Sequence, residues 1–520
     1  MRTLRIAATV GTALLVAIAP TVSPAAASPP SGLAGDAPLA GSPAEAPLAS
    51  PLSWHTCSTG PTDEDGAALD AAGARCAELT VSLDYSRPRG RTITIALSRL
   101  AATDPTHRRG AMLLNPGGPG DPALSLGVEL AQAAPALAAR YDMIGMDPRF
   151  VGRSSPVACR WDTGLSMRAA GPNRQTFAES VARARELAAG CVQGNEDVLP
   201  YASTRNTARD MDQVRAALGE AKLSYLGWSA GSYLGAVYTQ LFPGRVDRFV
   251  LDSAVDPEGY GPGVTRAMGA ATEAALRNWA GWAAGRDATY HLGATREAVL
   301  STVDRVARAA EARPLRVGEF TVDSHLLPEL LFLPIRFDTE ADYSGIAVDV
   351  RVLADAADGR PVTPTPGLLA SLTMAGTPGS GDGTFLLCAD RAAPRDPEVY
   401  YRDIQAHRAS EPLFGPLTRN ITPCAFWPTA PVEAPTRIRN TVPALIVGAS
   451  GDPRTPYPGQ LAMHRGLAGS RMVTLDNAYR HLVYGVEDNP CVDGAVNRYL
   501  LEGVLPAADL TCPRVSAAGS

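Results

Sequence analysis

Lysine is almost absent from this chain of 520 residues, in which Lys222 is the single example. Arginine supplies the other positive side chains, but no run of them is long enough to suggest a binding site for a polyanion. The formal net charge is only −6. The charge pattern therefore gives no indication of a nucleic-acid partner.

Long apolar runs are absent as well, except near the start. Residues 6–18 are rich in Ala, Val and Leu, follow Arg2 and Arg5, and precede three alanines at residues 25–27. A positive region, an apolar stretch and a small-residue cleavage site form the pattern of a secretory signal peptide. We expect residues 1–27 to be this signal peptide.

The rest of the chain has no segment that is apolar enough to span a bilayer. The first cysteine is Cys57, so the predicted cleavage site has no cysteine that could carry a lipid anchor. Residues 28–52 consist mainly of Pro, Ala, Ser and Gly, which predicts a disordered leader or propeptide. We therefore expect a secreted, extracellular, soluble protein without a membrane span.

The spacing Cys-x-x-Cys is also missing, which argues against a zinc site or a thioredoxin-like redox centre. An even number of cysteines in an oxidising compartment predicts disulfides. Many pairings are open, and the simplest is sequential: Cys57 with Cys76, Cys159 with Cys191, Cys388 with Cys424, and Cys491 with Cys512. We expect these cysteines to be structural, and we expect no metal and no cofactor.

What is present is a mixture of short apolar strands and amphipathic helices. The runs at residues 77–85 and 92–100 predict an antiparallel hairpin at a sheet edge. The later strands alternate with helices, which predicts an α/β fold with a mostly parallel sheet covered on both faces. These strands are expected at residues 111–114, 141–146, 223–226, 248–255, 444–447 and 471–475.

A long break separates the strand at residues 248–255 from the next one. It contains the helical patterns 270–284 and 296–312. A separate domain is one interpretation, but the sheet would be incomplete without the strands that follow. We therefore expect a mainly helical cap inserted into one sheet. The predicted divisions are a core in two parts, residues 53–255 and 442–520, and a cap at residues 256–441.

The pentapeptide Gly227-Trp228-Ser229-Ala230-Gly231 carries most of the chemical information. It follows the apolar run 223–226 and precedes a helical pattern at residues 232–242. A strand, a Gly-x-Ser-x-Gly turn and a helix form a nucleophile elbow, which exposes the serine hydroxyl. Glycines flank the serine because larger residues would clash in so tight a turn. We expect Ser229 to be the nucleophile, and the N–H of Ala230 to face an oxyanion.

A serine nucleophile needs a base and a carboxylate that orients the base. In chains with this elbow the order is serine, acid, histidine. Asp452 follows the strand at 444–447 and His481 follows the strand at 471–475, so both lie where an open α/β sheet places functional groups. We predict the triad Ser229, Asp452 and His481.

Asp252 competes with Asp452 for the role of acid, because it also ends a predicted strand. No other histidine follows the acid and the next strand: the remaining six are His55, His107, His291, His325, His407 and His464. The second oxyanion donor is expected in the glycine-rich loop at residues 115–120, where Gly118 has the N–H that the prolines lack. Residues 147–154 could shape this loop or form a packed turn.

With these residues in view, the chain resembles the secreted actinobacterial tripeptidyl aminopeptidases, relatives of the proline iminopeptidases within the α/β-hydrolases. The resemblance covers nearly the whole mature chain. The motifs that carry it are residues 116–120, 147–155, 227–231 and 451–456, His481 with Cys491 downstream, and the cap segments 388–390 and 424–428.

Three places differ from the family pattern. Pro116 stands where proline iminopeptidases usually carry histidine, and Tyr479-Arg480 precedes His481 where a glycine is common. The third is the stretch 326–349, which is not typical of the cap. Because the cap usually supplies the specificity pocket, this stretch bears on the choice of substrate.

The resemblance implies a serine exopeptidase that hydrolyses amide bonds near the free N-terminus of a peptide through an acyl-enzyme. Such an enzyme needs a carboxylate for the substrate ammonium. Candidates in the cap are Glu329, Asp338, Glu340, Asp342 and Asp390. The alternatives are a proline iminopeptidase, a secreted esterase or lipase with the same triad, and a non-catalytic binding protein on the same fold.

Overall fold

The computed structural model describes residues 52–165, 167–486 and 489–514, which belong to one compact unit. The predicted signal peptide at residues 1–27 lies outside the described residues. The predicted leader at residues 28–52 does so too, apart from its last residue. Within the described part of the chain, no helix combines the length and the apolar character that a membrane crossing requires.

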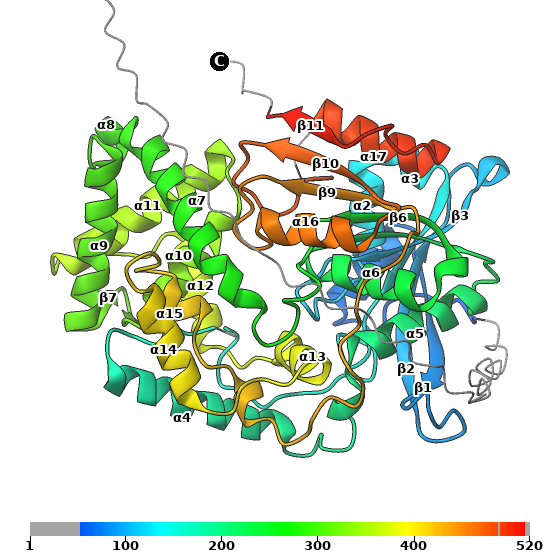
Figure 1. Cartoon of the computed structure of the whole chain (residues 1–520), viewed down its shortest axis with the longest axis horizontal. Helices are drawn as coiled ribbons and strands as arrows, with labels where there is room; N and C mark the ends of the chain where they lie inside the picture. The colour runs from blue at the N-terminus through cyan, green and yellow to red at the C-terminus, as the bar shows by residue number, and fades with distance from the viewer. Residues whose placement is uncertain (1–51, 166, 487–488, 515–520) are drawn as a thin grey trace, which may run out of the picture. The chain divides into compact units, whose positions relative to one another are not determined.

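Nine strands of the described chain form one sheet in the order β1-β2-β4-β3-β5-β6-β9-β10-β11 (Figure 1). The pairs β1–β2 and β2–β4 are antiparallel and the other pairs are parallel, as the sequence predicts. The bounds are β1 Arg75–Ser82, β2 Thr92–Leu100, β3 Gly110–Asn115, β4 Tyr141–Met146, β5 Leu223–Trp228, β6 Val246–Asp252, β9 Leu445–Ala449, β10 Arg471–Asp476 and β11 Leu510–Pro513. The sequence did not predict β11.

Helices cover both faces of this sheet, and alternate strand residues belong to different apolar clusters. In β3, Leu113 packs in the cluster that contains residues of α5 and α6, whereas Leu114 packs with residues of α2, α3 and α17. This burial on both faces is why the central strands are continuously apolar. The covering helices are α5 Thr204–Ala217, α6 Ala230–Leu241, α2 Leu126–Ala133, α3 Pro135–Ala138 and α17 Pro490–Glu502.

A helical insertion separates β6 from β9, and its helices α7, α9 and α11 pack against one another (Figure 1). Trp279, Val303 and Val350 lie in the apolar cluster of this insertion, which we call the cap. The predicted helices 270–284 and 296–312 correspond to α7 and α9. The main elements are α7 Met268–Ala284, α8 Asp287–Tyr290, α9 Arg296–Ala312, β7 Leu315–Val317, β8 Phe320–Val322, α10 Leu327–Phe332, η5 Pro334–Arg336, α11 Glu340–Ala357, α12 Pro366–Gly376, α13 Asp382–Asp390, α14 Pro397–His407, α15 Gly415–Thr418 and η6 Pro423–Phe426.

One long helix of the structure was missing from the sequence prediction. Helix α4 (Arg174–Val192) lies between β4 and α5 in the chain, but it packs against α14 and η6 of the cap. Phe177 of α4 joins Tyr400 and Ile421 in one apolar cluster. Asn173 forms a capping box with Thr176 at the start of the helix. The layer of cap helices therefore includes a segment from the first part of the predicted core.

Four disulfides join the eight cysteines in the sequential pairing that the sequence favoured. Cys388–Cys424 joins α13 to η6 within the cap. Cys491–Cys512 joins α17 to the last strand. Each bridge closes a local loop, and such cross-links stabilise the fold mainly by restricting the unfolded chain.

Candidate active site

Ser229 occupies the sharp turn between β5 and α6. Its backbone has φ of 53° and ψ of −123°, a strained conformation for a residue with a side chain. A Cβ atom on Gly231 would lie 2.6 Å from Asn115 Oδ1, and one on Gly227 would lie 2.7 Å from Gly231 O. The flanking glycines are therefore required by close backbone packing. Ser229 is half-buried between two buried neighbours, so its hydroxyl is accessible.

Asp452 and His481 meet at the carboxyl end of the sheet. The imidazole Nδ1 of His481 lies 3.0 Å from Asp452 Oδ2 and 3.1 Å from Oδ1. Both side chains are largely buried, with exposures of 10% for His481 and 0% for Asp452. Because β5, β9 and β10 are parallel, the loops that carry Ser229, Asp452 and His481 all leave the same edge of the sheet.

The Asp452 carboxylate also accepts hydrogen bonds from its own loop. Oδ1 accepts the backbone N–H groups of Arg454 and Thr455 at 2.7 and 2.9 Å. Oδ2 accepts the Thr455 hydroxyl at 2.6 Å and the Gln460 side chain at 3.3 Å. The contacts of Thr455 and Gln460 with this carboxylate were not predicted from the sequence. An Asp side chain that accepts the backbone N–H groups two and three residues later forms an Asx turn. The sequence signal for such a turn is an aspartate in a turn-forming segment, such as Asp452 between Gly451 and Pro453.

Asp252, the competing acid, has a different set of partners. Its carboxylate accepts the backbone N–H groups of Val483 and Tyr484, with distances of 3.1 Å and 2.7 Å to the nearer oxygens. The hydroxyl of Ser253 donates to it at 2.9 Å. Burial raises the pKa of Asp252 to about 7. Asp252 therefore contacts the backbone just after His481, whereas the imidazole faces Asp452.

The glycine-rich loop after β3 lies against the nucleophile turn. A Cβ atom on Gly117 would be 2.9 Å from Ser229 Cβ and 3.1 Å from Ala230 N. The Gly117 N–H donates to Asn115 Oδ1 at 3.0 Å, so it is already engaged. Among the described residues, the N–H groups of Gly118 and Ala230 have no such acceptor. These are the two donors that the sequence predicts for an oxyanion.

Residues 147–154 support the chain that follows this loop. The buried Asp147 carboxylate accepts the N–H groups of Ala123 and Arg153, each at 2.8 Å. The Ser154 hydroxyl donates to the carbonyl oxygen of Asp147 at 2.7 Å. The segment is thus a packed turn that also fixes the exit of the glycine-rich loop.

The cap contacts the acid loop through an arginine and a phenylalanine. The guanidinium carbon of Arg454 lies 3.3 Å from the ring centroid of Phe332, at the end of α10. The same guanidinium donates to the Phe332 carbonyl oxygen. Burial, together with the nearby charge of Arg336, lowers the pKa of Arg454 to about 9. Helix α10 therefore borders the loop that holds Asp452.

The five cap carboxylates have very different surroundings. Asp338 is buried in ion pairs with Arg480 and Arg514. Glu340 is exposed and accepts hydrogen bonds from Trp282 and Arg286. Asp342 accepts the hydroxyl of Thr339 at the start of α11. Asp390 accepts two hydrogen bonds from Thr204.

Glu329 is 3% exposed, and its Oε1 accepts the Met167 N–H at 3.3 Å. Its Oε2 is buried and has no hydrogen-bond partner among the described residues. Burial raises the pKa of Glu329 to about 8, although the charge of Arg168 opposes this shift. Of the five candidates, Glu329 is thus a buried carboxyl with one oxygen that has no hydrogen-bond partner among the described residues.

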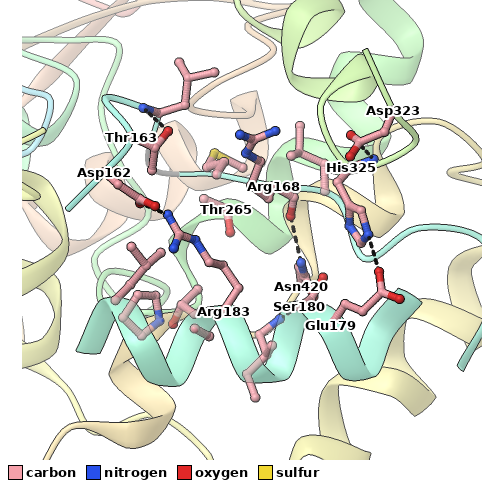
Figure 2. A pocket seen from close by; sticks show the side chains of 18 residues that line it. Asp162, Thr163, Arg168, Glu179, Ser180, Arg183, Thr265, Asp323, His325 and Asn420 are labelled. Carbon is pink, nitrogen blue, oxygen red and sulfur yellow. Dashed lines mark hydrogen bonds and ion pairs between the residues drawn. The ribbon is translucent and has the colours of Figure 1, made fainter. Parts of the chain in front are cut away.

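A cavity of about 430 Å³ lies among α4 and the cap, and Figure 2 shows its polar lining. Arg183 pairs there with Asp162, and His325 pairs with Glu179. No residue of the predicted triad lines this cavity. A smaller hollow of about 290 Å³ borders the nucleophile turn instead, and its largely apolar lining includes Pro116, Leu130, Trp228, Leu482 and Tyr484.

Two parts of the chain match known protein families. Residues 110–324 match the family described as alpha/beta hydrolase fold, and residues 411–512 match the family described as TAP-like protein. The chain is 35% identical to a tripeptidyl aminopeptidase of Streptomyces lividans over 458 residues, which cover 84% of this chain and 83% of that protein.

Two further relatives have different names. The chain is 29% identical to the serine protease Hip1 of Mycobacterium tuberculosis, over 89% of this chain and 91% of the relative. It is 31% identical to a carboxylesterase B of the same species, over 94% of this chain and 95% of the relative. Together with the nine-stranded sheet, these matches show that the chain belongs to the α/β-hydrolase family of the tripeptidyl aminopeptidases and their relatives.

Proposed function

We propose that the protein is a secreted serine exopeptidase that cleaves amide bonds near the free N-terminus of peptides. The observation that carries this proposal is the pair formed by His481 and Asp452 at the sheet edge where Ser229 follows its strand. The relatives named tripeptidyl aminopeptidase and serine protease support a peptide substrate. The four disulfides are in keeping with an oxidising compartment.

In the proposed reaction the hydroxyl of Ser229 attacks the scissile carbonyl, and His481 takes the hydroxyl proton through Nε2. Asp452 holds the imidazole in the orientation that leaves Nε2 free for this transfer. The N–H groups of Gly118 and Ala230 stabilise the oxyanion. His481 then gives its proton to the leaving amine, and water, activated by the same imidazole, hydrolyses the acyl-enzyme.

We assign the recognition of the substrate ammonium to Glu329. Its Oε2 has no hydrogen-bond partner among the described residues, and binding of an ammonium group would favour the ionised form of this carboxyl, whose pKa burial raises to about 8 in the free protein. Glu329 lies three residues before Phe332 on α10, so the two side chains share one side of the helix. The ring of Phe332 packs on the guanidinium of Arg454, and the backbone N–H of Arg454 donates a hydrogen bond to Asp452. These contacts connect the proposed ammonium site on α10 to the loop that holds Asp452.

An esterase is the second candidate, because the same triad hydrolyses esters and one relative is named carboxylesterase B. The apolar hollow beside Pro116 and Trp228 could hold an acyl or alcohol group equally well. The two functions differ in what lies at the far end of the substrate. An exopeptidase recognises a free amine, whereas an esterase has no need of one.

Three substrates separate these functions: a tripeptide anilide with a free amine, its N-acetylated form, and a short acyl ester. We expect hydrolysis of the free-amine anilide with a kcat/KM far above that of the blocked form. We expect Ser229→Ala to abolish this activity and labelling by a fluorophosphonate. Hydrolysis of the ester alone, or indifference to acetylation, would refute the exopeptidase.

A further inference from the structure

Two of the segments that differ from the family pattern lie in contact with each other. They are the cap stretch 326–349 and the pair Tyr479-Arg480 that precedes His481. In sequence the contacting residues Asp338 and Arg480 are 142 positions apart. Their contact makes a direct connection between the cap and the loop of the proposed base.

Three hydrogen bonds form this connection, which we call the histidine latch: Tyr479 N–H to Asp338 Oδ2 at 2.8 Å, Arg480 Nε to Asp338 Oδ1 at 2.7 Å, and His481 N–H to the Arg336 carbonyl oxygen at 2.7 Å. All three donors are consecutive residues of the histidine loop. The acceptors come from two residues of the cap, at the end of η5 and just after it. The cap thus holds three consecutive residues of the loop that ends in His481.

The latch is buried. The side chains of Asp338 and Arg480 are both 0% exposed. Arg514, at the end of the described chain, adds a further ion pair to Asp338 Oδ2 at 2.8 Å and donates to the Asp338 carbonyl oxygen at 2.5 Å. A buried ion pair with several hydrogen bonds holds its groups in one geometry, because each displacement leaves a charge without its partner.

The sheet holds the opposite side of the same loop. The Leu482 N–H donates to the Ser253 hydroxyl at 2.8 Å, and the next two N–H groups donate to Asp252. His481 therefore lies between two clamps, one from the sheet and one from the cap. The sheet clamp holds the backbone after the imidazole, and the latch holds the backbone of residues 479–481.

We propose that Asp338 is a positioning residue, which sets the imidazole of His481 through Tyr479 and Arg480. The proposal rests on the assignment of His481 as the base. It makes the cap part of the apparatus that positions the base. A shift of about 1 Å in a catalytic group can cost about 100-fold in rate. Loss of the latch therefore slows the chemical step, while the groups that bind substrate stay in place.

The experiment uses the full-length enzyme and three variants. Asp338→Asn weakens the latch. The double variant Asp338→Leu with Arg480→Met removes both charges and keeps the site packed, since apolar replacement of a buried ion pair often preserves folding. Glu340→Gln, two residues away on the exposed start of α11, is the matched control. Active sites are counted from the endpoint of fluorophosphonate labelling.

We expect kcat per labelled site to fall about 10- to 100-fold in the two latch variants, with KM changed less than about 3-fold. The rate constant of labelling should fall in parallel, because labelling also needs the base. Glu340→Gln should match the wild type. If Asp338 served folding alone, its replacement would lower the yield of labelled sites and leave kcat per labelled site unchanged.

A latch variant with the kcat per site and the labelling rate of the wild type would overturn the proposal. If Asp338→Asn does not fold, the same two measurements on the double variant test the proposal. The labelling rate is independent of the substrate class, so it stays informative if the enzyme proves to be an esterase. Activity that survives Ser229→Ala would instead refute the proposed function itself.

Discussion

The backbone carbonyl oxygen of Asp252 accepts the backbone N–H of Ser229 at 3.0 Å, while its carboxylate holds the chain just after His481. One residue of β6 thus connects the nucleophile turn to the histidine loop. Ser229 and His481 come from strands that are not neighbours in the sheet, since β6 and β9 lie between β5 and β10. Asp252 provides a hydrogen-bonded route between them.

This arrangement gives Asp252 and Asp452 different roles, which asparagine variants distinguish. Asp452→Asn should lower kcat by about 10⁴-fold, because the amide disfavours the tautomer of His481 that accepts the serine proton. Asp252→Asn keeps one acceptor for the backbone N–H groups and should cost about 10-fold at most. Steady-state kinetics on the free-amine anilide, with active sites titrated, measure both. A larger loss in Asp252→Asn than in Asp452→Asn would reverse the assignment.

Replacement of Glu329 by glutamine tests the ammonium site. We expect KM for the free-amine tripeptide anilide to rise about 30-fold, which corresponds to about 2 kcal/mol of lost ion-pair and hydrogen-bond energy. The slow hydrolysis of the acetylated anilide should not change, because that substrate has no ammonium. Glu319→Gln, at an exposed position between β7 and β8, serves as the control. Equal losses on both substrates would remove Glu329 from amine recognition.

The pH dependence of stability should reflect three buried acids. Burial raises the pKa of Asp252 and Asp390 to about 7 and that of Glu329 to about 8. Each native pKa lies above its unfolded value, so the native state holds protons that the unfolded chain has released. This contribution is complete below about pH 4 and is lost as the pH rises to about 8.

We therefore expect the free energy of unfolding to fall between pH 5.5 and pH 8, as measured by urea denaturation with the disulfides intact. Asp390→Asn should reduce this slope, because the amide does not titrate, whereas Asp358→Asn at a half-exposed cap position should not. A stability that is flat or rising over this interval in the wild type would contradict the assignment of neutral buried carboxyls.

The close approach of Gly117 to the nucleophile predicts a steric effect. An alanine there would place its Cβ 2.6 Å from the Trp228 carbonyl oxygen, and the backbone φ of +102° disfavours any side chain. The loop must move, so Gly117→Ala should lower kcat by about 10²- to 10³-fold, comparable with the loss of an oxyanion donor. Gly244→Ala, where a Cβ meets open space, is the control. Unchanged kcat in Gly117→Ala would mean that the loop is not part of the oxyanion site.

The sequence predicted the parts of the site that depend on local pattern. The elbow around Ser229 is recognisable because its strand, glycines and helix are contiguous. Asp452 and His481 could be chosen because each follows an apolar strand, and the order of the three residues is characteristic. The structure brings Asp452 and His481 into contact, and the position of Ser229 at the same edge follows from the parallel strands.

The sequence did not predict contacts between distant segments. Asp338 and Glu329 look alike in sequence, because both are acids in the same cap stretch. In the structure, Asp338 forms ion pairs with two arginines, whereas Glu329 Oε2 has no hydrogen-bond partner among the described residues. The sequence did not predict helix α4 because many of its apolar residues are alanines. Its few large apolar side chains pack on elements such as α14, which is far away in sequence. Strand β11 is short and mostly exposed, so it has no apolar signature.

The insertion between β6 and β9 also affects the order in which a growing chain acquires its parts. A ribosome completes the turn that carries Ser229 before it makes the cap, and the cap before the strands that lead to Asp452 and His481. In the proposed triad, a chain that stops within the cap contains the nucleophile without its acid and its base. We therefore expect hydrolytic activity only from chains that extend beyond residue 481.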